Sequence, residues 1–228
     1  MFKAIRIFLL LLILAVVALD TWRTKTRSVE WKNTLPVNIY LINGDASEVT
    51  AEYLRGLKLA DFKPIEAFMQ EEAARYGHAE KASIEVRLGG LLPAQPPAPP
   101  ANGSALEIII WSLQMRWWAF RNADTRGPGT QVKLFLLYFD PVQNNRLAHS
   151  TGLQKGLIGR VNVFASSAMV SQNNVVIAHE FLHTLGATDK YDPATNLPLF
   201  PDGYANPDLD PLLPQRFAEI MAGRPPMS

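Results

Sequence analysis

The sequence predicts an α/β (α+β) fold with a twisted mixed sheet of about five strands, one functional helix and a small irregular C-terminal subdomain. Short β-branched runs alternate with segments of helical periodicity, and Gly, Pro and Asn clusters separate them. The chain has 228 residues, which suits one domain with accessory segments. Apolar residues make up 48% of it and charged residues 19%, so a packed core can form.

The first half of the chain is expected to start the sheet and to supply one covering helix. Residues 35–42 alternate, include β-branched side chains and run into turn residues at 43–45, which predicts a strand. Residues 61–76 carry apolar side chains at helical spacing, which predicts an amphipathic helix. Residues 83–88 alternate strictly and predict a half-buried strand.

Residues 93–102 are expected to form a loop. Five of the eight residues from 93 to 100 are proline, which neither pairs within a sheet nor continues a helix. Three further runs with strand character follow, at residues 106–111, 131–139 and 157–164. The irregular C-terminal subdomain is expected over residues 187–228.

Aromatic side chains gather after the first of these three runs, at Trp111, Trp117, Trp118 and Phe120. Large aromatic residues beside strand residues mostly belong to the core or its edge, so we expect these four to be buried. A ligand platform or a membrane-contacting loop is the alternative interpretation.

The amino terminus, residues 1–32, is expected to be a signal peptide or signal anchor with a spacer, ahead of the main domain at 33–228. Lys3 and Arg6 precede an apolar run of 13 residues, Ile7–Leu19. A membrane-spanning helix needs about 20 residues and a signal-peptide core about 7–15, so the length favours export. Under the positive-inside rule, four basic residues after the run oppose it, namely Arg23, Lys25, Arg27 and Lys32. We predict an exported or membrane-anchored protein whose main domain is extracytoplasmic.

Charge and cysteine content exclude two kinds of partner. The net charge is +1, from 22 basic and 21 acidic side chains, so no global field attracts nucleic acid and we expect no nucleic-acid partner. The chain has no cysteine, which excludes disulfides and thiolate metal sites. Any transition metal must therefore be held by nitrogen and oxygen.

A pattern typical of metal binding, His-Glu-Phe-Leu-His, lies at residues 179–183. His179 and His183 are four residues apart, so on a helix both imidazoles lie on one face and can bind one ion. Glu180 is rotated by about 100° from His179, which suits a general base beside the ion. The opposite face is apolar and suits burial; it carries Ile177, Ala178, Phe181 and Leu185.

The residues after this pattern predict a third ligand. Gly186 can adopt the left-handed conformation that ends a helix and reverses the chain, which returns Asp189 toward the histidines. Two histidines and a carboxylate leave one position open on a tetrahedral zinc ion, as in catalytic sites. Zinc lowers the pKa of bound water to about 7, which favours amide hydrolysis at neutral pH. Asp192 and Glu219 are alternative third ligands.

Residues 179–189 resemble the motif of the metzincin clan of zinc peptidases, in the variant with aspartate as third ligand, as in the snapalysin-like enzymes. The resemblance implies the order strand, helix and further strands before the active-site helix. It also implies a methionine turn beneath the metal, which residues 219–223 match with Met221. Only seven residues follow Met221, too few for the long C-terminal helix of the clan.

Other polar residues are candidates for supporting roles. Tyr191 and Tyr204 can donate a hydrogen bond to a developing oxyanion. The remaining two histidines, His78 and His149, lie in polar loop sequence and are interpreted as solvated surface residues. A structural calcium ion is a further candidate cofactor, with ligands from Asp192, Asp202, Asp208 and Asp210.

The sequence therefore predicts a zinc metalloendopeptidase, a hydrolase with one catalytic Zn²⁺ ion held by His179, His183 and Asp189 and with Glu180 as the base. Its expected partners are a peptide or protein substrate, paired with an edge strand beside the cleft, and a membrane that contacts the N-terminal apolar segment. One alternative is a thermolysin-type peptidase with Glu219 as a distant ligand. The other is a non-catalytic, membrane-associated binding module stabilised by zinc.

Overall fold

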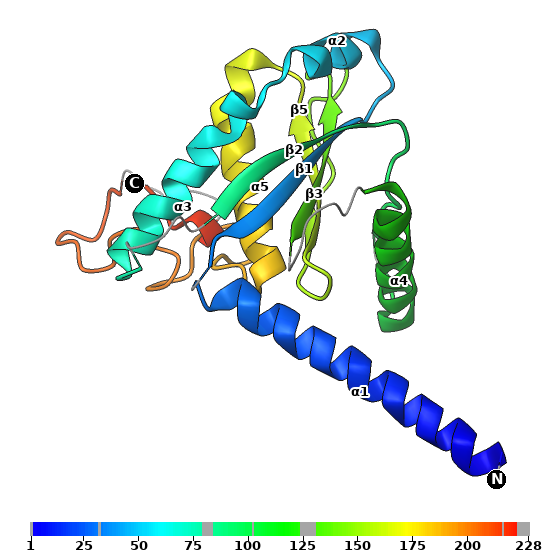
Figure 1. Ribbon diagram of the computed structural model, residues 1–228. Coiled ribbons are helices and arrows are strands. Elements are labelled where there is room, and N and C mark those ends of the chain that lie inside the picture. Colours follow the sequence, from blue (N-terminus) through cyan, green and yellow to red (C-terminus); the bar gives the residue numbers. More distant parts are fainter. Residues whose placement is uncertain are drawn as a thin grey trace.

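A mixed α/β architecture is confirmed by the computed structural model, which describes residues 2–31, 33–78, 84–101, 103–123, 131–215 and 217–222. Within these residues, one sheet has five strands in the order β2-β1-β3-β5-β4 (Figure 1). Neighbouring strands are parallel except β4, which pairs antiparallel with β5 at one edge. The strands are β1 (Leu35–Asn43), β2 (Ile84–Leu92), β3 (Val132–Phe139), β4 (Thr151–Leu153) and β5 (Ile158–Phe164).

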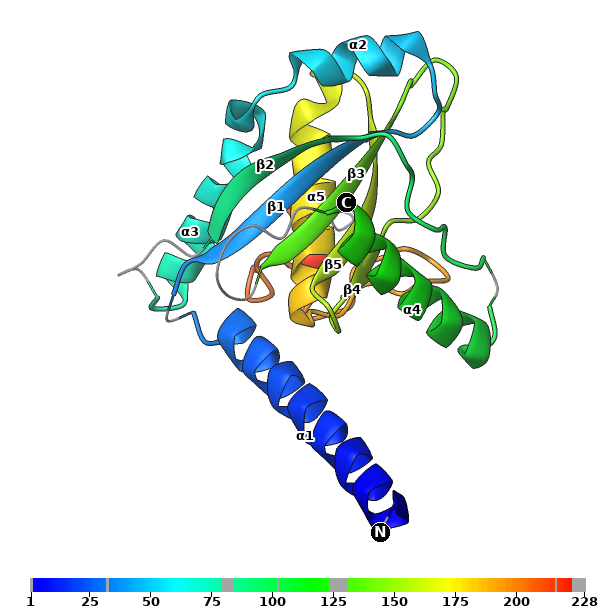
Figure 2. The ribbon, with the colours of Figure 1, turned by 45° about the vertical axis from the view of Figure 1, so that its right-hand side comes forward.

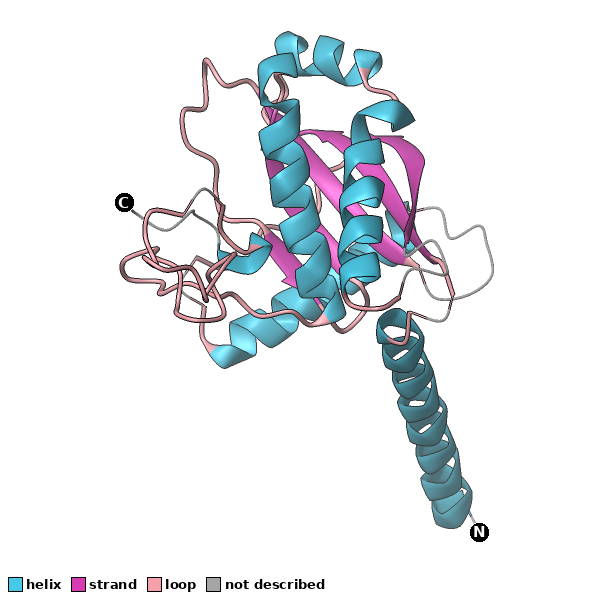
Figure 3. Cartoon of the chain, turned by 90° about the vertical axis from the view of Figure 1, so that its left-hand side faces the viewer, coloured by secondary structure: helices cyan, strands magenta, loops and turns pink. Residues whose placement is uncertain are grey.

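Helices cover both faces of the sheet (Figures 1 and 2). One face packs against α3 and α5 and the other against α4, while α1 extends away from the domain (Figure 3). The α-helices are α1 (Phe2–Val29), α2 (Glu48–Gly56), α3 (Lys63–Arg75), α4 (Ala105–Asn122) and α5 (Val170–Leu185). Three short 3₁₀ helices are η1 (Leu59–Phe62), η2 (Ser167–Met169) and η3 (Ile220–Ala222).

Two apolar layers form the core, one on each side of the sheet. The layer beneath α3 and α5 contains Ile39 and Phe181, and the layer beneath α4 contains Tyr40 and Phe135. Ile39 and Tyr40 are adjacent in β1 and point to opposite faces, because side chains alternate along a strand. A strand buried on both faces is apolar at nearly every position, which explains the continuous apolar runs of β1 and β3.

Four of the predicted strands and the predicted first helix are confirmed. The strands expected at 35–42, 131–139 and 157–164 are β1, β3 and β5, and the helix expected at 61–76 is η1 followed by α3. The strand expected at 83–88 is β2, although Ser83 lies outside the described residues.

The proline-rich segment, predicted to be a loop over residues 93–102, is a loop over residues 93–101. It follows β2 and is held against the turn after β1, because Gln95 Nε2 donates to the carbonyl oxygens of Asn43 at 3.1 Å and Gly44 at 2.9 Å. Residue 102 lies outside the described residues.

The prediction of a strand at residues 106–111 is wrong, because this segment forms the first turns of α4. Ser104 is its N-cap: Ser104 Oγ accepts from Glu107 N at 3.4 Å, and the Glu107 carboxylate accepts from Ser104 N at 2.7 Å. This capping box satisfies amide groups that no helical carbonyl reaches and starts the helix at Ala105. The sheet nevertheless has five strands within the described residues, because β4, which was not predicted, is the fifth.

The expectation that these four aromatic residues belong to the core or its edge is correct for Trp111 and for Trp118, which is half-buried, and wrong for the other two. Trp111 is buried, and Trp118 packs edge-on against Phe135 with ring centroids 4.9 Å apart. Trp117 and Phe120 are on the opposite side of α4 and are 62% and 68% exposed. Helix α4 places Trp111 and Trp118 on its inner face and Trp117 and Phe120 on its outer face. The prediction of a strand and a loop did not separate the four residues in this way.

The N-terminal apolar run, Ile7–Leu19, forms part of α1. Within the part of the chain that the structure describes, no helix combines the length and the apolar character needed to cross a bilayer. Export or membrane attachment through this segment stays a prediction.

The placement of α4 is tested by two neighbouring substitutions. Met115 is fully buried and Leu113 is 57% exposed, although the two would share a face in a strand. We expect Met115→Ala to lower the free energy of unfolding by about 2–5 kcal/mol, because it leaves a cavity between α4 and the sheet. Leu113→Ala should change it by less than about 0.5 kcal/mol. Urea unfolding followed by circular dichroism measures both, and equal losses would contradict the helical assignment.

Candidate metal centre

Helix α5 carries the candidate site and is fixed against the sheet by polar and apolar contacts. Asn173 accepts from Phe164 N at 3.1 Å and donates to Phe164 O at 2.8 Å, which ties the first turn of α5 to the end of β5. Asn174 Nδ2 donates to Asp61 O at 2.8 Å. The predicted apolar face is confirmed, since all four of its residues are buried: Ile177, Ala178, Phe181 and Leu185.

The predicted reversal at Gly186 is confirmed. Gly186 caps α5 in the left-handed region with φ of 103°, where a side chain would be strained. Its N–H donates to His183 O at 3.0 Å, and Ala187 N donates to Leu182 O at 3.1 Å. The chain therefore turns back along the helix, and this turn brings Asp189 to the histidines.

Three candidate ligand atoms converge at the end of α5. Nε2 of His179 and Nε2 of His183 are 3.1 Å apart, and Oδ1 of Asp189 lies 3.3 Å and 3.1 Å from them. Zinc bonds of about 2.0–2.1 Å at the tetrahedral angle separate neighbouring ligand atoms by about 3.3–3.4 Å. The spacing of these three atoms therefore fits a zinc ion.

The tautomers of both histidines are fixed by backbone carbonyls. Nδ1 of His179 lies 3.0 Å from Ile220 O, and Nδ1 of His183 lies 2.8 Å from Ala187 O. A carbonyl oxygen only accepts, so each Nδ1 carries a proton, and the Nε2 lone pair of each imidazole is the one directed at the ligand cluster when the ring is neutral. Two lone pairs and a carboxylate oxygen at these distances repel one another unless a cation or a proton lies between them. The donor set thus suits a borderline metal such as Zn²⁺.

Glu180 is a buried carboxylate beside these atoms. It is 7% exposed, and its carboxylate lies within 4.8 Å of the ligand nitrogens of His179 and His183. Oε2 of Glu180 is buried and has no hydrogen-bond partner among the described residues. Burial, and next the negative charge of Asp189, raises the pKa of Glu180 to about 8. A cation at the ligand atoms would offset the cost of burying this charge.

The segment predicted to form a methionine turn contains η3 and lies beside His179. Met221 is buried, and Ile220 supplies the carbonyl that orients His179. The Glu219 carboxylate accepts from Met221 N at 2.6 Å and so binds the backbone of its own turn. Burial raises the pKa of Glu219, and the backbone hydrogen bonds oppose this shift. Gly223, the last residue of the predicted turn, lies outside the described residues.

The other carboxylates of the C-terminal segment are not brought to the histidines. Asp192 Oδ1 accepts from the backbone N–H groups of Ala194 at 2.7 Å and Thr195 at 3.2 Å. Asp202 lies 3.3 Å from Lys190 Nζ, and Asp208 and Asp210 are exposed. Among the described residues, His179, Glu180 and His183 form the one compact group of potential metal ligands, with Asp189 adjoining it. The calcium site stays a prediction without support from these contacts.

The two candidate tyrosines are in different places. Tyr191 lines the cavity that contains His179 and Glu180, and its phenol lies close to the Asp189 carboxylate. Burial, and then the negative charges of Asp189 and Glu180, raises the pKa of Tyr191. Tyr204 lines a separate cavity, where its ring lies 5.5 Å from that of Phe200. The structure therefore brings Tyr191 to the candidate centre and does not bring Tyr204.

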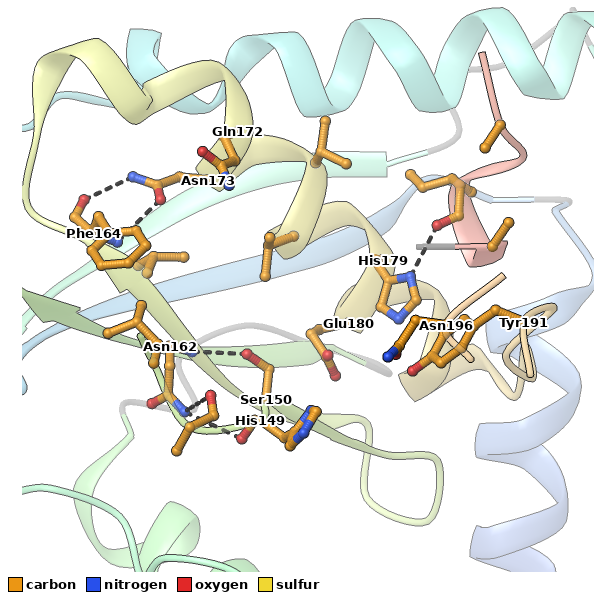
Figure 4. Close-up of a pocket in the computed structure, with 18 of the residues that line it drawn as sticks. His149, Ser150, Asn162, Phe164, Gln172, Asn173, His179, Glu180, Tyr191 and Asn196 are labelled. Carbon is orange, nitrogen blue, oxygen red and sulfur yellow. Dashed lines mark hydrogen bonds between the residues drawn. The ribbon is translucent and has the colours of Figure 1, made fainter. Parts of the chain in front are cut away.

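A cavity of about 490 Å³ opens beside His179 and Glu180. Figure 4 shows the ring of His179 and the carboxylate of Glu180 directed into it, with His149 below them. His149 is exposed, as predicted, but its position on the cavity wall was not. Buried Asn162 fixes this wall, because its Nδ2 donates to Ala148 O at 3.0 Å and His149 O at 3.2 Å. No local sequence pattern indicates this long-range contact.

Strand β4 packs directly on the helix that carries the histidines. A Cβ atom at Gly152 would lie 2.5 Å from His183 Cβ and 2.8 Å from Glu180 O, closer than side chains tolerate. Only glycine therefore permits this approach of strand and helix. The edge strand lies along the candidate centre as a result.

Comparisons with protein-family models, with curated proteins and with solved structures give no match. The function of the chain must therefore be inferred from the chemistry of the site.

The third ligand is tested by zinc titration of single variants. We expect the wild-type chain to bind one Zn²⁺ ion and Asp189→Ala to weaken the affinity by about 100-fold or more, because it removes an atom that faces both imidazoles. Asp192→Asn is the matched control and should bind like wild type, since it keeps an oxygen for its backbone contacts. Glu219→Gln also keeps an oxygen for Met221 N but removes a charge near His179, so it should weaken binding less than Asp189→Ala. Competition with a chromophoric chelator measures the affinities. A larger loss for Glu219→Gln than for Asp189→Ala would refute this ligand set.

The contact between β4 and α5 is tested at Gly152. We expect Gly152→Ala to lower the free energy of unfolding by about 1–3 kcal/mol and to weaken zinc binding, because the new methyl group displaces His183. Gly56→Ala is the control: no atom lies within 4 Å of its added Cβ. Denaturant unfolding with and without zinc separates the two effects, and an unperturbed Gly152→Ala variant would show that the strand and helix are further apart.

Proposed function

We propose that the protein is a zinc-dependent endopeptidase with His179, His183 and Asp189 as ligands and Glu180 as general base. The observation that carries the proposal is the convergence of two Nε2 atoms and one carboxylate oxygen within 3.1 to 3.3 Å of one another. Both imidazoles are fixed in the ligating tautomer. A metzincin-like fold is part of the proposal, supported by the order of elements and by Met221 in the turn beside His179.

The proposed role of each residue in hydrolysis follows from its position in the site. Zinc, when bound, supplies Lewis-acid activation of a peptide carbonyl and of water. Glu180 is next to the ligands and is not needed as one of them, so its carboxylate can take a proton from water and return it to the leaving amine. Tyr191, on the cavity wall, has a hydroxyl that can donate to a carbonyl oxygen as negative charge develops.

An extended peptide is the substrate class that the surroundings of the site favour. β4 pairs with β5 on one side and is the edge strand on the other, within the described sheet. Unpaired backbone groups of an edge strand can pair with an extended peptide. Since Gly152 of β4 lies against Glu180 and His183, a peptide paired there would pass along the candidate ligands.

The alternative with Glu219 as distant ligand has less support. Its carboxylate accepts from Met221 N at 2.6 Å, whereas Oδ1 of Asp189 faces both imidazoles. The non-catalytic zinc-stabilised module has the same ligands and differs only in lacking turnover, so activity separates it from the peptidase.

Activity is tested with Glu180→Gln in the full chain loaded with zinc. We expect cleavage of an unfolded protein such as casein to fall by about 10²- to 10⁴-fold, because the variant cannot accept a proton. The zinc content should stay at the wild-type level, since Glu180 is not proposed as a ligand. Peptide release and metal analysis measure the two quantities.

The matched control is Glu48→Gln, which makes the same chemical change on the exposed surface of α2 and should keep wild-type activity. Full activity of zinc-loaded Glu180→Gln would contradict the proposed role of Glu180 as general base. A wild-type chain that zinc stabilises against heat but that cleaves neither casein nor a peptide library would instead be a binding module.

A further inference from the structure

Helix α4 presents an apolar stripe to solvent. The stripe consists of side chains that are 46% to 68% exposed, namely Leu106, Ile110, Leu113, Trp117 and Phe120. Their spacing of four, three, four and three residues places them on one face of the helix. The rings of Trp117 and Phe120 stack with centroids 5.9 Å apart. Contiguous exposed apolar surface of this kind marks an interaction site.

This stripe cannot turn inward, because the opposite face of α4 is anchored. Met115 and Ala119 are buried against the sheet. Trp111 is also buried, and its Nε1 donates to Pro97 O at 3.0 Å, so the proline-rich loop holds α4 as well. The outward face is therefore a fixed feature of the fold.

The charges of α4 border the stripe on both sides. At about 100° per residue, Arg116 and Arg121 fall on opposite edges of it. The guanidinium of Arg121 lies 5.9 Å from the centre of the Trp117 ring. Glu107 is the only acidic residue in the sequence of α4, and its carboxylate is engaged by Ser104 N and Oγ at 2.7 and 2.8 Å. The outward face is thus apolar in the middle and cationic at its margins.

We propose that the outward face of α4 binds the surface of an anionic lipid bilayer. Apolar side chains with interfacial tryptophan, bordered by arginine, match the acyl and headgroup layers of such a membrane. In Figures 1 and 2, α4 lies in the lower half of the domain, toward the end from which α1 extends with its exposed apolar side chains. The binding surface is separate from the candidate metal centre and does not depend on peptidase activity.

The test uses the absence of cysteine from the chain, which allows one fluorophore to be attached at a chosen position. Leu113→Cys places it in the stripe, and Ile109→Cys is a second position on the same face in case the first variant does not fold. Val49→Cys is the matched control, at an exposed apolar position of α2 at the opposite end of the molecule (Figure 1). The full chain is mixed with vesicles of phosphatidylcholine, with or without phosphatidylglycerol, that carry brominated acyl chains.

We expect the label at Leu113 to be quenched by brominated vesicles that contain phosphatidylglycerol, and much less by phosphatidylcholine alone. The label at Val49 should be unaffected. Vesicles that sediment the chain without quenching the Leu113 label would show that α1 alone binds, and equal quenching at both positions would show undirected adsorption. Either result overturns the proposal. Burial of the Leu113 label in the absence of vesicles, caused by self-association of the chain, would overturn it as well.

A second measurement removes the stripe's aromatic residues. The double variant Trp117→Ser and Phe120→Ser should lower the partition coefficient into phosphatidylglycerol vesicles by about tenfold or more, because two large apolar side chains no longer insert. Arg121→Gln should reduce the preference for anionic over neutral vesicles. Val49→Ser is the matched control and should partition like wild type. Unchanged partition of the double variant would overturn the proposal.

Discussion

Two hydrogen bonds from imidazole to backbone hold the candidate metal centre in order. His179 and His183 donate from Nδ1 to the carbonyls of Ile220, the first residue of η3, and Ala187, both in the chain that follows α5. The orientation of both rings therefore depends on how this chain lies against the helix. Lys190 N donates to Met221 O at 2.8 Å, which ties the beginning of the segment to its end. The two imidazoles are therefore held in place only when the C-terminal segment keeps its folded conformation.

Buried amides fix the position of α5 along its own axis. Apolar contacts are non-directional, so Ile177 and Phe181 alone would let the helix shift along the sheet. Hydrogen bonds have narrow limits of distance and angle, and the paired bonds of Asn173 with Phe164 set one position only. Gly152 then lets β4 approach the last turn. The imidazoles are thus pre-organised from both ends of the helix, as a precise functional site requires.

The features that were predictable from the sequence have local causes. The four-residue spacing of His179 and His183 and the left-handed Gly186 are properties of short segments. The prediction of a strand at 106–111 was wrong because a short apolar run does not distinguish a strand from a helix by its period. The Ser104–Glu107 capping box is the local sequence feature that indicates a helix there. β4 has only three residues and exists through its pairing with β5, so nothing local marks it. Tyr191 and Tyr204 line different cavities because of the path of the chain after α5, which likewise has no local sequence signal.

Exposure divides the candidate centre into two parts with different physical roles. The side chains of His179 and His183 are 15% and 19% exposed and that of Asp189 is 41% exposed, whereas Glu180 is 7% exposed. Structural zinc sites are closed by four protein ligands, whereas three candidate ligands converge here and one of them, His179, lines a cavity of about 490 Å³. In the proposed peptidase, this open side is where a substrate would enter. Electrostatic interactions strengthen where water is excluded, so the buried side is where a carboxylate acts most strongly on a proton or a cation.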